Sequence, residues 1–159
     1  MQRIARFERV TGWDFVELPE RATAGSAGYD IKTPAEIRLG PGESTVVETG
    51  LRCRMEEGWV LVVAPRSGLG FRYRLQLDNT IGVIDQDYYY ADNEGHIKIK
   101  ITNDSREGKI LELPAGKAFA QGIFLPFGIT EDDRAEGERR GGMGSTDARD
   151  SADPAGGER

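Results

Sequence analysis

Apolar and polar residues alternate with a period of two in the most regular parts of this chain. From His96 to Thr102, isoleucines alternate with basic or polar residues, which gives one apolar and one basic strand face. Residues 59–64 form a continuous apolar run, β-branched in part, whose length suits a buried strand. We therefore expect strands over both segments.

Shorter apolar segments continue this pattern. Residues 45–47 and 51–55 flank a turn at Gly50, and an apolar segment runs from residue 118 to 127 with Pro126 near its end. No 12-residue window shows convincing helical periodicity. Short strands at close spacing with Gly/Pro turns predict an all-β barrel or sandwich. Turn signals separate the strands at Gly40-Pro41-Gly42, Glu57-Gly58, Asn93-Glu94-Gly95 and Pro114-Ala115-Gly116.

The C-terminal part of the chain differs in composition. Residues 147–159 contain no Val, Ile, Leu, Met or aromatic residue, so this tail is expected to be disordered. Residues 130–140 are polar and highly charged, as in a mobile arm. We therefore expect a β-barrel domain over residues 1–128, an arm with a glycine-rich motif over residues 129–146, and a disordered tail from residue 147.

Composition excludes several classes of protein. The chain has 159 residues, a net charge of −6, one cysteine and one histidine, which excludes an internal disulfide and a multi-histidine metal centre. No apolar run approaches the ~20 residues that a membrane span needs, and the first ten residues lack a secretory signal. We therefore expect a cytoplasmic protein. Net acidity argues against non-specific nucleic-acid binding but leaves room for a small anion held by local cations.

Two segments carry candidate chemistry next to predicted strands. Arg66, Ser67 and the flexible Gly68 follow the apolar run 59–64, and a guanidinium, a hydroxyl and free backbone N–H groups suit phosphate oxygens. In residues 79–88, Val83 and Ile84 would anchor a strand edge and leave Asp85 partly buried, as a general base requires. The structural alternatives are a polar loop and a hairpin with a solvated aspartate.

Three further segments are weaker when each is taken alone. Small residues lead to Asp30 in residues 24–30, and Gln121 offers both a donor and an acceptor in residues 117–122. Residues 139–146 combine two arginines, three glycines and two hydroxyls, which could cover a phosphate. Each segment also has a structural explanation as a turn, a satisfied polar residue in a barrel, or a flexible linker.

In their order along the chain and in their residues, the five segments together resemble the motifs of the trimeric dUTPase family, the deoxyuridine triphosphate nucleotidohydrolases. The resemblance covers roughly residues 18 to 146. It implies a jelly-roll, or distorted β-barrel, that assembles as a homotrimer with active sites between subunits, where the C-terminal arm of one chain closes over a site on the others. The matching residues are Ala27-Gly28-Tyr29-Asp30, Pro65-Arg66-Ser67-Gly68, Asn79 with Gly82-Val83-Ile84-Asp85 and Tyr88, Ala120-Gln121-Gly122, and Gly141-Gly142-Met143-Gly144-Ser145-Thr146.

The resemblance also implies a reaction: hydrolysis of dUTP to dUMP and pyrophosphate by attack of water on the α-phosphorus. This keeps dUTP low and supplies dUMP for dTMP synthesis. Asp85 would be the general base, Arg66 and Gln121 would act at the phosphates, and Asp30 would place Mg²⁺ through water. The implied substrate-binding residues are Ser67, Gly68, Asn79, Gly82, Val83, Ile84, Tyr88, Arg139, Gly142, Met143, Gly144 and Ser145.

Three departures from the family pattern leave alternatives open. The segment between Tyr88 and Ile97 is longer than in common members, so Tyr88, Tyr89 or Tyr90 could face the sugar. The arm arginine is assigned to Arg139, with Arg140 as the alternative. Met143 stands where the family usually has Phe, so we expect weaker closure over the base.

Two other functions are alternatives to dUTP hydrolysis. One is a dCTP deaminase-like enzyme, which shares the fold and nucleotide pocket but needs a buried acid beside the pyrimidine amine. The other is a non-catalytic, nucleotide-gated binding module of the dUTPase type. The intact Asp85, Arg66 and Gln121 argue against loss of chemistry. His96 is expected to cap a turn, and Cys53 to be a small buried residue.

Overall fold

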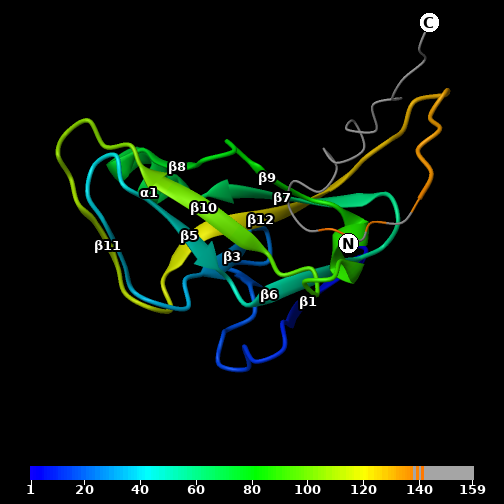
Figure 1. Cartoon of the computed structure of the whole chain (residues 1–159), viewed down its shortest axis with the longest axis horizontal. Coiled ribbons are helices and arrows are strands. Elements are labelled where there is room, and N and C mark those ends of the chain that lie inside the picture. The colour runs from blue at the N-terminus through cyan, green and yellow to red at the C-terminus, as the bar shows by residue number, and fades with distance from the viewer. Residues whose placement is uncertain (138, 140, 142–159) are drawn as a thin grey trace, which may run out of the picture.

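The computed structural model describes residues 1–137, 139 and 141. Figure 1 shows a predominantly β structure, as the alternating pattern predicts. The described strands are β1 (Ala5–Arg9), β2 (Glu20–Arg21), β3 (Tyr29–Lys32), β4 (Ile37–Leu39), β5 (Ser44–Glu48), β6 (Leu51–Met55), β7 (Trp59–Pro65), β8 (Leu75–Leu77), β9 (Gly82–Ile84), β10 (Lys98–Asn103), β11 (Leu111–Leu113) and β12 (Ala118–Pro126). The helices are α1 (Ser67–Tyr73) and the 3₁₀ helix η1 (Gln86–Tyr90). The described part of the chain has no helix long and apolar enough to span a membrane.

Antiparallel pairing organises the strands into four sheets. The largest has the order β2-β3-β12-β7-β9, and a second has the order β5-β10-β8. Two strand pairs, β1 with β6 and β4 with β11, complete the arrangement. The sheets do not close into one continuous barrel, and their arrangement is consistent with the predicted jelly-roll-like fold.

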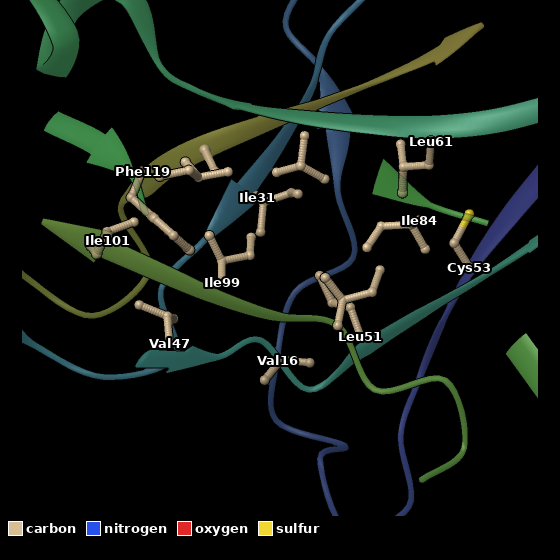
Figure 2. Packing of buried hydrophobic residues seen from close by; sticks show 14 of the residues in the cluster. Val16, Ile31, Val47, Leu51, Cys53, Leu61, Ile84, Ile99, Ile101 and Phe119 are labelled. Atoms are coloured by element: carbon tan, nitrogen blue, oxygen red, sulfur yellow. The ribbon is translucent and has the colours of Figure 1, made fainter. Parts of the chain in front are cut away.

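The core lies between these sheets and is built from the apolar face of each strand. In Figure 2, Ile31, Ile84 and Phe119 point from three different strands into one interior. Leu61 and Phe119 are fully buried, and each such side chain contributes about 1.5–3 kcal/mol on leaving water. The core therefore holds together strands that are far apart in the sequence.

The strands predicted from the sequence are present at nearly the predicted bounds. In β10, Ile99 and Ile101 are buried whereas Lys100 is exposed, which confirms the two-faced pattern. Helix α1 has seven residues and buries none of them, so it leaves no amphipathic signal in the sequence. Cys53 is buried, as expected.

Candidate functional site

Three of the five motif segments meet at one end of the five-stranded sheet. Gln121 of β12 pairs with Asp30 of β3 on one side and with Ala64 of β7 on the other. Arg66, directly after β7, places its guanidinium 3.1 Å from the Asp30 carboxylate. The Gln121 amide donates a hydrogen bond to the carbonyl oxygen of Pro65 at 3.2 Å. We call Asp30, Arg66 and Gln121 the phosphate cluster.

Two glycines near this cluster have different roles. A Cβ at Gly28 would lie 2.6 Å from Oε1 of Gln121, so the missing side chain makes room for that amide. A Cβ at Gly68 would have no neighbouring atom within 4 Å, and both Gly68 and Ser67 are exposed. The start of α1 is therefore open for a ligand to approach its backbone and the Ser67 hydroxyl.

The third motif forms a separate cavity of about 390 Å³. The turn from β8 to β9 contributes Asn79, and β9 contributes Gly82 and Ile84. Gly82 is buried, and a Cβ there would lie 3.1 Å from the side chain of Val63. The turn and β9 therefore pack closely against β7. This arrangement suits a flat ligand that forms hydrogen bonds with backbone groups.

Two expectations for this segment need correction. Ile84 is 8% exposed and anchors β9, but Val83 is 55% exposed and does not, because consecutive strand residues point to opposite faces. The Asp85 side chain is 52% exposed, more than predicted, because it lies beyond the last paired residue of β9. Water can therefore reach its carboxylate.

The three consecutive tyrosines have three different environments. Tyr88 is 3% exposed and lines the cavity, and its hydroxyl donates to the carbonyl oxygen of His96 at 2.8 Å. Asn93 donates to the same hydroxyl at 2.9 Å. Tyr89 donates its hydroxyl hydrogen to Glu8, and Tyr90 is 64% exposed. The geometry thus favours Tyr88 as the residue that faces a sugar.

Arg139 lies over the third motif. After β12 the chain leaves the sheet, seen as the orange segment of Figure 1, and Arg139 returns to donate a 2.6 Å hydrogen bond to Asp85 and a 3.5 Å bond to Asp87. Its guanidinium lies 5.2 Å from the centre of the Tyr88 ring. Burial alone would lower the pKa of Arg139, but the hydrogen bond and charge of Asp85 outweigh it and raise the pKa.

The other arm residues assigned from the sequence cannot be placed in the same way. Arg140, Gly142, Met143, Gly144 and Ser145 lie outside the described residues, as does the predicted tail from residue 147. Arg139 is thus the arm arginine whose contacts support a role at the site.

The phosphate cluster and the third motif lie at opposite ends of β7. Ile84 pairs with Leu61, so Asp85 follows at the level of Val60, whereas Arg66 follows the other end of the strand. Six residues of strand at about 3.3 Å each separate the two levels by roughly 20 Å. Asp85 and Arg66 of one chain therefore lie too far apart to contact the same small group.

The donor set of the phosphate cluster suits Mg²⁺ held indirectly. Among the described residues, no group of three or more His, Cys, Asp or Glu side chains could hold a metal ion. Asp30 is the one carboxylate of the phosphate cluster, and it already pairs with Arg66. Since Mg²⁺ keeps several waters and prefers substrate phosphates, one carboxylate is compatible with a contact through water, and this role of Asp30 stays a prediction.

Two lysines for which the sequence left a substrate contact open lie at the cavity. Lys98 and Lys100 line it, and they form ion pairs with Glu48 at 2.5 Å and with Asp78 at 2.9 Å, respectively. The alternation in β10 predicted their common face, which was expected to be solvated, with contact to a substrate or to a trimer axis as the alternative. The position of β10 beside β8 brings this basic face to the cavity.

Comparisons with known proteins agree with the motif pattern. A family model described as dUTPase matches residues 14–147. A deoxyuridine 5'-triphosphate nucleotidohydrolase of Lactococcus lactis subsp. lactis is 39% identical over 151 residues, which cover 92% of this chain and 99% of that relative. These matches confirm the resemblance inferred from the five motifs.

Solved structures agree as well. The crystal structure of a dUTPase from Streptococcus mutans superposes with a TM-score of 0.69 at 37% identity and covers 79% of this chain and 98% of that one. The structure of a mutant dUTPase from phage phi11 of S. aureus, described as coordinating a structural Mg(II) ion, superposes with a TM-score of 0.68 and covers 85% of this chain and 98% of that one. At 22% identity, the phage protein supports the fold alone.

His96 supports the site without facing a ligand. The backbone N–H of Gly50 donates to Nε2 of His96 at 2.9 Å, and the ring packs edge-on against Trp13 at 5.2 Å. This confirms the expected role of His96 at a turn. Burial, with a smaller contribution from the Lys98 charge, lowers the pKa of His96 below its ordinary value of 6.5.

This lowered pKa predicts acid sensitivity. Above about pH 6.5 His96 is neutral in both states, and its contribution to stability is complete. As the pH falls below that value, the unfolded chain binds a proton that the folded chain resists, so the free energy of unfolding decreases. Urea unfolding across this range should show a steeper loss for the wild type than for His96→Gln, whose amide oxygen can accept the Gly50 hydrogen bond without titrating. Equal pH slopes for the two proteins would contradict this assignment.

Proposed function

Because the chain belongs to the dUTPase family, we propose that it hydrolyses dUTP to dUMP and pyrophosphate by attack of water on the α-phosphorus. The observation that carries the mechanism is the position of Asp85. Its half-exposed carboxylate lies beside the cavity lined by Asn79, Gly82 and Tyr88, within reach of water and next to Arg139. This arrangement suits a general base that acts on a nucleotide bound in the cavity.

The cavity suits uracil and a deoxyribose. Asn79 and the backbone of residues 82–85 would pair with N3–H and O4 of uracil, and cytosine would cover these groups and leave them unpaired. The Tyr88 ring would pack against the deoxyribose. Since hydrogen bonds to His96 and from Asn93 fix the Tyr88 hydroxyl, the ring cannot easily move aside for a 2′-hydroxyl.

The reaction requires Asp85 to be released from Arg139. In the free chain the guanidinium of Arg139 binds the Asp85 carboxylate. Phosphate oxygens would compete for this guanidinium, because bidentate pairing with phosphate is strong. Asp85 then takes a proton from water as the oxygen–phosphorus bond forms, and the bond to the bridging oxygen breaks with release of pyrophosphate. General-base catalysis contributes typically ~10²–10⁴-fold in rate.

The phosphates would be held by the phosphate cluster. Arg66, Ser67 and Gly68 would bind the α- and β-phosphates, and Gln121 would support them. Asp30 would hold Mg²⁺ through water, and the bound ion would neutralise phosphate charge and fix the triphosphate conformation. The Asp30 carboxylate on β3, the Gln121 amide on β12 and the Arg66 guanidinium directly after β7 lie on adjacent parts of one sheet, which supports this assignment.

A complete site would need more than one chain. The roughly 20 Å of β7 between Asp85 and Arg66 supports a site in which one subunit supplies Asp85 and another supplies the phosphate cluster. Following the family resemblance, we take the assembly to be a homotrimer. The arm residues Arg139, Gly142, Met143, Gly144 and Ser145 would close over the bound nucleotide.

The two alternative functions fit the site less well. A deaminase of this fold needs a buried acid beside the pyrimidine amine, whereas Asp85 is half exposed and paired with an arginine. A non-catalytic binding module would not require the base, the phosphate cations and Gln121 together. The arrangement of these groups therefore supports hydrolysis at phosphorus.

The substrate is tested directly by incubating the purified protein with Mg²⁺ and, separately, dUTP, each of the four standard deoxynucleoside triphosphates, and UTP. Pyrophosphate and ammonia are measured in parallel. We expect pyrophosphate from dUTP alone. Ammonia from dCTP would indicate the deaminase, and the absence of both products would indicate the binding module.

The role of Asp85 is tested by Asp85→Asn, which keeps the shape of the side chain but removes the base. We expect nucleotide binding to persist and kcat to fall by at least ~10²-fold. Asp87→Asn is the matched control, because it removes the more distant carboxylate at Arg139 and should reduce kcat far less. If Asp85→Asn turned over dUTP at the wild-type rate, Asp85 would not be the base.

A further inference from the structure

Tyr89 lies outside the nucleotide cavity but is bound more firmly than its exposed neighbour Tyr90. Its hydroxyl donates a 2.6 Å hydrogen bond to Oε2 of Glu8, a residue 81 positions earlier in the chain. Arg52 binds the same oxygen at 3.0 Å, and its guanidinium lies 4.5 Å from the centre of the Tyr89 ring. We call Glu8, Arg52 and Tyr89 the η1 clamp, because they attach η1 to strands β1 and β6.

The strand pair holds the two charged members of the clamp in place. Glu8 and Arg52 are directly opposite in the antiparallel pairing of β1 with β6, where cross-strand contacts are closest. Both side chains are mostly shielded, with 19% and 25% exposure respectively. The hydrogen bond from Tyr89, followed by the Arg6 and Arg52 contributions, lowers the pKa of Glu8 despite partial burial, so its carboxylate remains ionised.

The Arg52 guanidinium contacts the Glu8 carboxylate and the Tyr89 ring. Its Nε is the buried side-chain polar atom without a hydrogen-bond partner among the described residues. An unpaired buried donor costs about 1–3 kcal/mol. The guanidinium is therefore oriented by the Glu8 oxygen and the Tyr89 ring rather than by its own full set of donors.

The clamp acts on the segment that carries Asp85. Helix η1 begins directly after Asp85, whose carbonyl oxygen accepts a hydrogen bond from the Tyr88 backbone N–H at 3.2 Å. No side chain caps this helix, and a 3₁₀ helix of five residues has weak internal hydrogen bonding. Its orientation therefore depends on side-chain contacts, which Tyr88 makes toward His96 and Tyr89 makes toward Glu8.

We propose that Tyr89 is a positioning residue for the reaction: bound by Glu8 and Arg52, it fixes η1 so that the Asp85 carboxylate and the Tyr88 ring stay in register with the bound nucleotide. This inference rests on the proposed hydrolysis of dUTP. A displacement of about 1 Å at a reacting group can cost ~10²-fold in rate. Most of the proposed substrate contacts, those of the turn from β8 to β9 and of the phosphate cluster, lie outside η1, so loss of the clamp reduces kcat more than it raises KM.

The test compares Tyr89→Phe with the wild type. This substitution keeps the ring beneath Arg52 and removes only the hydroxyl that binds Glu8. We expect kcat for dUTP to fall by at least ~10-fold while KM stays within about twofold. Amide hydrogen exchange over residues 85–90 should become faster, which reports on the clamp independently of activity.

Two further variants make the result specific. Glu8→Gln weakens the same contact from the other side and also removes the ion pairs of Glu8 with Arg6 and Arg52. Tyr89→Phe should therefore lower kcat less in the Glu8→Gln background than in the wild type, because their shared contact is already weakened there. Tyr90→Phe removes a hydroxyl from the exposed neighbouring ring and should leave kcat, KM and exchange unchanged. If the wild type is active and Tyr89→Phe has the same kcat and the same amide exchange rates as the wild type, the proposal is overturned. An inactive wild type would instead refute the proposed function, and the exchange rates would still show whether the clamp holds η1.

Discussion

The length of strand β7 is the constraint on which the rest of the site depends. β7 pairs with β12 along its whole length and with β9 at its central residues 61–63, so Asp85, which follows β9, lies toward one end of β7 and Arg66 follows the other end. A strand cannot shorten, because its rise per residue is fixed by backbone geometry. Asp85 and Arg66 are therefore kept apart within one chain, which supports the proposal that a complete site forms between chains.

Electrostatics within each half follow from this separation. Without a substrate, Asp30 neutralises the positive charge of Arg66 in the phosphate cluster. Asp85 of the third motif neutralises the positive charge of Arg139. Both pairs join a cation suited to phosphate with a carboxylate that has its own proposed task. A bound triphosphate would compete for both cations, which explains how a chain of net charge −6 could bind a highly charged anion.

Much of the fold was predictable because strand alternation is a local property. The pattern of Ile99 and Ile101, the buried run in β7 and the extent of β12 were all evident in the sequence. The orientation of the three tyrosines was not, because η1 has a different period from a strand and each ring is held by residues distant in sequence, such as Glu8. The pairing of Arg139 with Asp85 likewise depends on how the chain returns after β12.

The most direct test of a site shared between chains is complementation between two inactive variants. Asp85→Asn removes the base and Arg66→Ala removes the phosphate cation, and each variant is purified alone and then unfolded and refolded together with the other. A shared site predicts that the mixture hydrolyses dUTP well above either parent, since some interfaces combine an intact Asp85 with an intact Arg66. A mixture no more active than the average of the two parents would contradict the account, because it would place all the chemistry within one chain.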